Sequence, residues 1–173
     1  RGGGDEGGLL KSIIKSRTIL VAEVVSDKLY QKVVSRLLLM QMDDDKAPVT
    51  KEAFWEVMIS CLLTTQQRSG PSSSVTRFIL TKPFPLRHEL CCQQEDMDLF
   101  VTRILTDFGG LRRSTTIGRE AKSNATFLES NGWQAASQVL ESVRRHPSPE
   151  TERHAARFVD ENFQGFGPKQ SRN

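Results

Sequence analysis

Residues 161–173 read ENFQGFGPKQSRN, which is a helix end followed by a Gly-Phe-Gly turn, a proline and a lysine. Two glycines one residue apart, Gly165 and Gly167, indicate a turn that needs positive φ and close backbone approach. Phe166 between them can pack into a core, and Pro168 is typical of the first position of a helix. The stretch therefore predicts two helices joined by a tight hairpin.

Such a hairpin has a chemical use. Its free N–H groups and the positive end of its second helix face outward, and this arrangement suits a phosphate of DNA. An alternative is a glycine-rich helix end with a second helix behind it and no ligand. Taken alone, the stretch leaves both interpretations open.

The length and composition of the chain restrict the number of domains and the classes of partner. The chain has 173 residues, enough for one domain with a real core. Its net charge of +3 permits nucleic-acid binding without arguing strongly for it. No run approaches the roughly 20 apolar residues of a membrane helix, so no membrane partner is predicted. Residues 1–8 read as a flexible tail, 9–45 as an N-terminal helical segment and 46–173 as the main domain.

The three cysteines favour an intracellular protein. Cys61, Cys91 and Cys92 are an odd number without a secretory signal, which is typical of reduced thiols. They form no zinc spacing with each other, and no close Cys/His set is expected. No cofactor is predicted within the chain.

The pattern of apolar residues predicts an all-α domain of six to eight helices. The expected helices cover 51–66, 71–79, 96–108, 116–130, 132–145 and 149–162. Residues 82–92 are expected to be irregular because of Pro83 and Pro85. Asn131 and Gly132 are expected to end a helix in left-handed conformation. Residues 18–25, TILVAEVV, leave a strand open as an alternative.

The hairpin GFGPKQSRN resembles that of the helix-hairpin-helix DNA glycosylases, which excise damaged bases. Their pattern is glycine, apolar residue, glycine, any residue and then a diagnostic position. The lyase-competent members, the oxoguanine and thymine-glycol glycosylases, carry a lysine there, and here it is Lys169. The resemblance implies that Lys169 is the catalytic nucleophile.

Two upstream segments extend the resemblance over roughly 47–173. WEVMISCLLTTQQRSG, 55–70, is similar to the first core helix of these enzymes, after which a polar residue fills the gap left by the flipped base. Gln66 matches that position, with Gln67 as the alternative register. DFGGLRRSTTIGREA, 107–121, is a looser match to a turn between helices in the middle of the bundle.

The resemblance implies a base-excision-repair DNA glycosylase with apurinic-site lyase activity, 8-oxoguanine being the favoured base. It implies damaged double-stranded DNA as partner, a monomer at full length, and a location in a prokaryotic cytoplasm or nucleoid, or in a eukaryotic nucleus. The implied DNA-binding residues are Gln66, Gln67, Gly165, Phe166 and Gly167. Two alternatives stay open: a glycosylase for oxidised pyrimidines, and a non-catalytic helix-hairpin-helix module that grips DNA.

One departure from the family pattern shapes these expectations. The family's catalytic aspartate, and any iron–sulfur cysteines, lie downstream of the lysine and hence beyond Asn173. We therefore expect a fragment, a glycosylase helical bundle that is incomplete at its C-terminal end, with the hairpin at 158–173. A further set of basic side chains is expected to be solvated surface, with phosphate contact as the alternative: Arg112, Arg113, Arg119 and His154.

Overall fold

The computed structural model describes residues 48–65, 67 and 70–166, and every regular element among them is helical. This confirms the all-α class for the described part of the chain. The expectations for 1–8 and 9–45 lie outside the described residues. The elements are α3 (Lys51–Leu63), α4 (Ser74–Leu80), α5 (His88–Cys92), α6 (Met97–Phe108), α7 (Ser114–Phe127), the π-helical turn η1 (Leu128–Gly132), α8 (Trp133–Arg145) and α9 (Pro149–Asn162).

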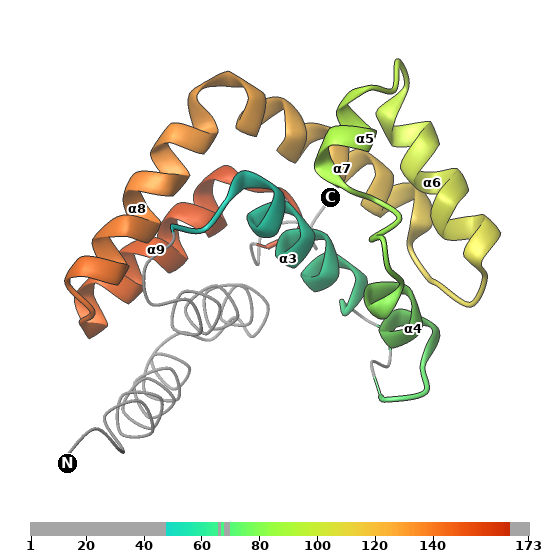
Figure 1. The fold of residues 1–173 in the computed structure, drawn as a ribbon, viewed down its shortest axis with the longest axis horizontal. Coiled ribbons are helices and arrows are strands. Elements are labelled where there is room, and N and C mark those ends of the chain that lie inside the picture. Colours follow the sequence, from blue (N-terminus) through green and yellow to red (C-terminus); the bar gives the residue numbers. More distant parts are fainter. Residues whose placement is uncertain (1–47, 66, 68–69, 167–173) are drawn as a thin grey trace, which may run out of the picture.

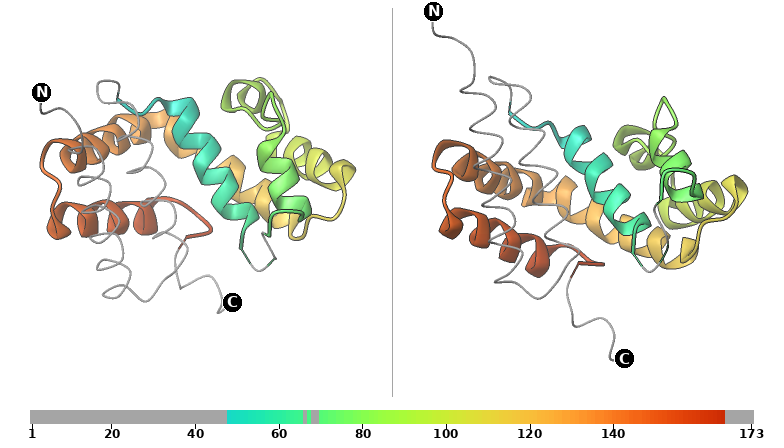
Figure 2. Two further views of the ribbon diagram at one scale, coloured as in Figure 1. Left: turned by 60° about the horizontal axis from the view of Figure 1, so that its bottom comes forward. Right: turned by 90° about the horizontal axis from the view of Figure 1, so that it is seen from below.

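The longest feature is a bent helical path formed by α7, η1 and α8 (Figure 1). α6 packs along α7 at one end of this path, and α9 packs along α8 at the other. α3 lies on the inner side of the bend, between the two pairs (Figures 1 and 2). Among the described residues, no helix is long and apolar enough to cross a membrane.

α3 is the central helix of the core. It begins at Thr50, whose hydroxyl accepts a hydrogen bond from the N–H of Ala53 at 3.1 Å. Trp55 is completely buried, and its Nε1–H donates to the carbonyl of Leu86 at 2.8 Å. The buried residues of this helix are Phe54, Trp55, Val57, Met58, Ile59, Ser60, Cys61, Leu62 and Leu63.

Local signals in the sequence predicted two helix ends correctly. α6 ends at Gly109, which has φ of 84°. α9 begins with Ser148 as its cap and Pro149 at the first helical position, and Thr151 completes a capping box. Each of these ends depends on residues within one turn of the helix.

Three expectations about helix bounds were wrong. The short helix after 70 begins at Ser74 rather than at Pro71, because Ser73 is the residue that caps it. Residues 82–92 are not irregular throughout, since α5 occupies His88–Cys92. Its start is supported by Glu52, whose Oε1 accepts a hydrogen bond from the N–H of His88 at 2.6 Å.

The third error concerns Asn131 and Gly132. Gly132 has φ of −65° and ψ of −37°, so it is right-handed. The helical path is nevertheless interrupted near the expected place, because Ser130 has a non-helical ψ of −133° and kinks the path between α7 and α8. A Cβ at Gly132 would clash with the carbonyl of Phe127, so the kink requires a glycine for space and not for a left-handed conformation.

Candidate nucleic-acid interface

The first half of the predicted hairpin follows α9 directly. Gly165 has φ of +91°, a backbone conformation that L side chains rarely adopt. Phe166 is buried, at 1% exposure. Both features agree with the sequence prediction for the turn.

The turn is attached to α7 by Asn124, a side chain that was not predicted from the sequence. The N–H of Gln164 donates to Oδ1 of Asn124 at 2.7 Å, and Nδ2 of Asn124 donates to the carbonyl of Gln164 at 3.1 Å. The side chain of Asn124 is buried at 1% exposure, whereas Gln164 is exposed, so the two bonds join the interior to the surface of the turn. The amide of Asn124 thereby fixes the backbone that enters the hairpin.

Gly165 also lies against the last turn of α3. A Cβ built on it would clash with Cδ2 of Leu62 and would lie 3.0 Å from Cδ of Glu120. Leu62 belongs to the upstream segment that resembles the glycosylase core helix. The two segments that carry the resemblance, about 100 residues apart in the chain, therefore meet at this glycine.

Gln67 connects the end of α3 to the loop before α7. Its Oε1 accepts a hydrogen bond from the N–H of Arg112 at 3.0 Å, and its Nε2 donates to the carbonyl of Leu63. Both polar ends of the side chain are therefore occupied within the protein. To insert into DNA, Gln67 would first have to give up these two bonds, which favours Gln66 for that role.

A buried ion pair lies beside the turn. Arg113 Nη2 is 3.0 Å from Oε1 of Glu120, whose side chain is 6% exposed. Burial raises the pKa of Glu120 above its ordinary value, against the lowering effect of Arg113. Glu120 Oε2 and Arg113 Nη1 are buried and have no hydrogen-bond partner within the described part of the chain. A carboxylate oxygen with unused hydrogen-bonding capacity, Glu120 Oε2, therefore lies next to Gly165.

The prediction that Arg113 is solvated surface was wrong. Its side chain is 21% exposed and pairs with Glu120, and its backbone is left-handed, with φ of 60°. Arg112, Arg119 and His154 are exposed. Their alternative role as phosphate contacts stays a prediction.

Three predicted site residues lie outside the described residues. They are Gln66, Gly167 and the expected nucleophile Lys169. Gln67, Gly165 and Phe166 are described, and they lie in the region where the end of α3, the start of α7 and the turn after α9 converge. The described half of the hairpin is thus placed, and the roles of all six residues in DNA binding or catalysis stay predictions.

A second cluster, on the other side of α3, was not predicted from the sequence. The expectation that no close Cys/His set exists was wrong, because His88 and Cys92 lie one turn apart on α5 and face Glu129 of η1. The spacing of a histidine four residues before a cysteine was visible in the sequence. It was overlooked because Pro83 and Pro85 led to the expectation of irregular backbone there.

Comparison of the chain with protein-family models, with curated proteins and with solved structures found no match.

Proposed function

We propose that this protein is a base-excision-repair DNA glycosylase with apurinic-site lyase activity, with 8-oxoguanine as the favoured base. The observation that supports it best is the close packing of two distant segments that both resemble this superfamily. Gly165, which follows α9 and has a positive φ, packs against Leu62 of α3. Gln66 and Gln67 come three and four residues after the last residue of that helix in the sequence. In a base-flipping enzyme, the backbone grip and the gap-filling residue must lie close together, because both act on the same nucleotide.

Two features of the turn support this proposal. Gly165 lets the backbone pack closely against Leu62, and Phe166 and Asn124 hold the turn to the protein by burial and hydrogen bonds. Rigid backbone donors bind phosphate at little entropic cost and carry no base preference. Exposed Arg112 and Arg119 near the start of α7 add positive charge to the same region.

The chemistry is assigned to Lys169. Its neutral amine attacks the anomeric carbon of the flipped nucleotide and displaces the damaged base. The amine then forms a Schiff base with the opened sugar, and loss of a proton allows β-elimination and strand breakage. An exposed lysine is protonated at neutral pH, so the amine needs a lowered pKa. A helix beginning at Pro168, as the sequence predicts, would supply part of that shift through its positive end.

The decisive experiment is borohydride trapping with the natural gene product, including any residues that follow Asn173. Duplexes containing 8-oxoguanine, thymine glycol or an abasic site are incubated with enzyme and reductant. We expect a covalent adduct that Lys169→Gln abolishes, while Lys122→Gln, which removes an exposed lysine of α7, leaves it intact. A Lys169→Gln protein that still traps at the wild-type level would exclude this residue as nucleophile.

The same experiment separates the alternatives. Trapping on thymine glycol but not on 8-oxoguanine would indicate a glycosylase for oxidised pyrimidines. Duplex binding without any trapping by the unaltered protein would indicate the non-catalytic DNA-gripping module and overturn the enzymatic proposal.

A second measurement tests the DNA-binding face. Removing one interaction between a basic side chain and a phosphate should reduce the slope of log affinity against log salt by about 0.9 for duplex DNA. We expect Arg112→Gln and Arg119→Gln to show this reduction on any duplex sequence. Arg153→Gln, near the start of α9 and so at the end of that helix away from the turn, should leave the slope unchanged. If all three substitutions change the slope by the same amount, the DNA does not bind at the start of α7.

A further inference from the structure

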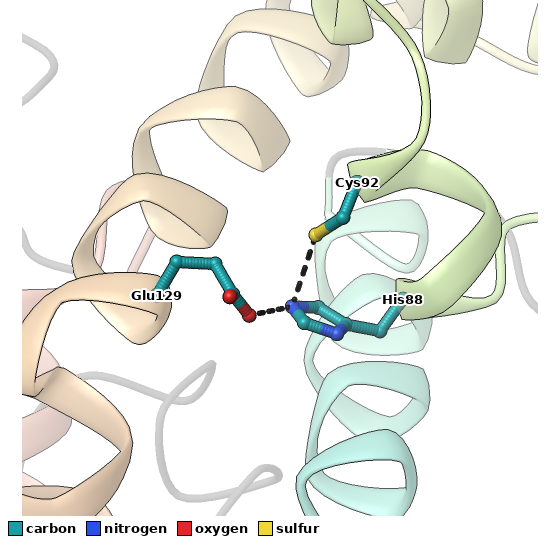
Figure 3. Close-up of side chains that lie close together, drawn as sticks. All are labelled: His88, Cys92 and Glu129. Atoms are coloured by element: carbon teal, nitrogen blue, oxygen red, sulfur yellow. Dashed lines mark hydrogen bonds and ion pairs between the residues drawn. The ribbon is translucent and has the colours of Figure 1, made fainter.

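A three-residue cluster lies apart from the hairpin, between α5 and the π-helical turn. His88 and Cys92 project from successive turns of α5, and Glu129 reaches toward them from η1 (Figure 3). His88 Nε2 lies 3.2 Å from Glu129 Oε1 and 3.4 Å from Cys92 Sγ. The three ligand atoms all lie within 4.8 Å of one another.

His88 Nε2 can form a hydrogen bond with only one of its two neighbours at a time. His88 Nε2 carries at most one proton in the neutral ring, yet it faces both a carboxylate and a sulfur. With the proton on Nε2, the ring can donate a hydrogen bond to Glu129. The thiol of Cys92 then cannot donate its proton to this nitrogen. With the proton on Nδ1, the lone pair of Nε2 accepts a hydrogen bond from the thiol but is repelled by the carboxylate of Glu129. A cation at the centre would be attractive to all three atoms.

We infer that His88, Cys92 and Glu129 form a zinc site, with water as the fourth ligand. Tetrahedral zinc with bonds of about 2.0–2.1 Å to nitrogen and oxygen and about 2.3 Å to sulfur sets neighbouring ligand atoms about 3.3–3.6 Å apart. The two distances to His88 Nε2 already lie close to that range. Cys92 and Glu129 are exposed, so rotation of their side chains can bring sulfur and oxygen together.

The choice of metal follows from the donor atoms. A thiolate, an imidazole and a carboxylate together are typical of zinc, whereas calcium and magnesium prefer oxygen ligands alone. Before a metal binds, Cys92 is a neutral thiol, and the carboxylate of Glu129 pairs with Lys51, whose Nζ is 3.0 Å from Glu129 Oε1. Binding of the metal releases the thiol proton, and the bound thiolate and carboxylate then carry two negative charges, against the single positive charge of Lys51.

The histidine is held in place for ligation by its surroundings. Its side chain is 7% exposed, and its ring packs edge-on against Trp55 with ring centroids 5.1 Å apart. Glu52 accepts the backbone N–H of His88 and so fixes the start of the helix that carries two of the ligands. Burial lowers the pKa of His88, which favours the neutral ring that binds metals.

The third ligand lies where the helical path is kinked. Glu129 directly precedes Ser130, whose φ of −75° and ψ of −133° are not helical. A metal bound here would link α5 to the junction of α7 and α8, two parts of the fold that are distant in the chain. The metal would stabilise the bend of the helical path, and its water ligand would leave one coordination position open, as in zinc sites with three protein ligands.

Cobalt is a suitable probe, since Co²⁺ takes the place of zinc and absorbs visible light. The whole chain is freed of metal with a chelator, desalted and titrated with Co²⁺, and the cobalt is then displaced by Zn²⁺. We expect one equivalent to bind, with a thiolate-to-cobalt charge-transfer band and the visible bands of four-coordinate cobalt. Zinc should remove these bands and raise the Tm.

Two variants and one control identify the ligands. Cys92→Ser should remove the charge-transfer band, although Cys61 and Cys91 remain. Glu129→Gln should weaken binding by more than the roughly 10–100-fold that loss of an outer hydrogen-bond partner costs. Glu89→Gln, an exposed acid on the same short helix, should bind as the unaltered protein does. Circular dichroism checks that each variant is folded.

Three results would overturn the assignment: no stoichiometric cobalt or zinc binding, a charge-transfer band that survives Cys92→Ser, or equal weakening by Glu89→Gln and Glu129→Gln. None of these outcomes depends on DNA or on Lys169, so the zinc site and the glycosylase proposal can fail independently.

Discussion

Asn124 and Gln164, 40 residues apart in the chain, exchange two part-buried hydrogen bonds between α7 and the hairpin turn. The side-chain amide of Asn124 both donates to and accepts from the backbone of Gln164. A carboxylate of the same shape can only accept, and an apolar side chain can do neither. This single amide therefore sets where the turn lies on the helical path.

Replacing Asn124 by Leu should destabilise the protein by about 1–3 kcal/mol, because two part-buried hydrogen bonds to the backbone of Gln164 are lost. Urea unfolding followed by circular dichroism measures the loss. Asn131→Ala, at an exposed position, is the matched control and should change stability by less than about 0.5 kcal/mol. Equal effects of both substitutions would contradict the role of Asn124.

Gly165→Ala should destabilise the turn by about 1–3 kcal/mol from its positive φ alone. The clash of the new Cβ with Leu62 adds to this cost, since Leu62 lies within the core. Gly70→Ala is the comparison, because nothing lies within 4 Å of a Cβ there. Unfolding midpoints that fall alike for both variants would show that the turn does not require glycine.

Trp55→Phe should cost about 1–3 kcal/mol of unfolding free energy, because the buried carbonyl of Leu86 loses its donor. The smaller ring also leaves space beside His88, which packs against the indole. Trp133→Phe, at a half-buried position, should be milder. The prediction fails if the substitution at Trp133 is the more damaging of the two in denaturant titrations.

Glu120 should make the stability depend on pH. Burial raises its pKa above the ordinary value of 4.5, so the folded state holds the proton more tightly than the unfolded chain does. The stabilisation is therefore fully present below the ordinary pKa and is lost as the pH rises through the higher folded-state value. Glu120→Gln should flatten this part of the stability profile.

Unfolding measured at several pH values from acidic to neutral would show the difference between the two profiles. Glu161→Gln, an exposed residue of α9, should leave the profile of the unaltered protein in place. If Glu120→Gln changes stability by a constant amount at every pH, the carboxyl does not titrate in this range.

Much of the helical framework could be predicted because its signals are local. Thr50 and the Ser148–Pro149 pair mark helix starts through hydrogen bonds and backbone angles within a single turn. Gly109 marks a helix end in the same way. The left-handed Gly165 and the burial of Phe166 were likewise anticipated from the short motif that contains them.

The candidate sites could be predicted only in part. The sequence predicted that the hairpin and the end of α3 are parts of a site, but it did not predict a role for Asn124. The residues next to an asparagine within a helix do not show whether its side chain is buried or what it binds. The partner of Asn124 is the backbone of a residue 40 positions away. The His88, Cys92 and Glu129 cluster was missed because Glu129 comes from a helix 41 residues beyond His88.

The sequence by itself determined that this chain forms short helices with defined ends, since caps, glycines and prolines act on their immediate neighbours. Where two backbone conformations were equally compatible with the neighbouring residues, only the tertiary structure decided between them. The Asn-Gly pair at 131–132 could take a left-handed or a right-handed conformation, and in the folded chain Gly132 is right-handed, with the kink at Ser130. Residues 88–92 became a helix because a carboxylate from α3, Glu52, supplied the partner for its first N–H. Such partners are brought close by folding, and no window of neighbouring residues contains them.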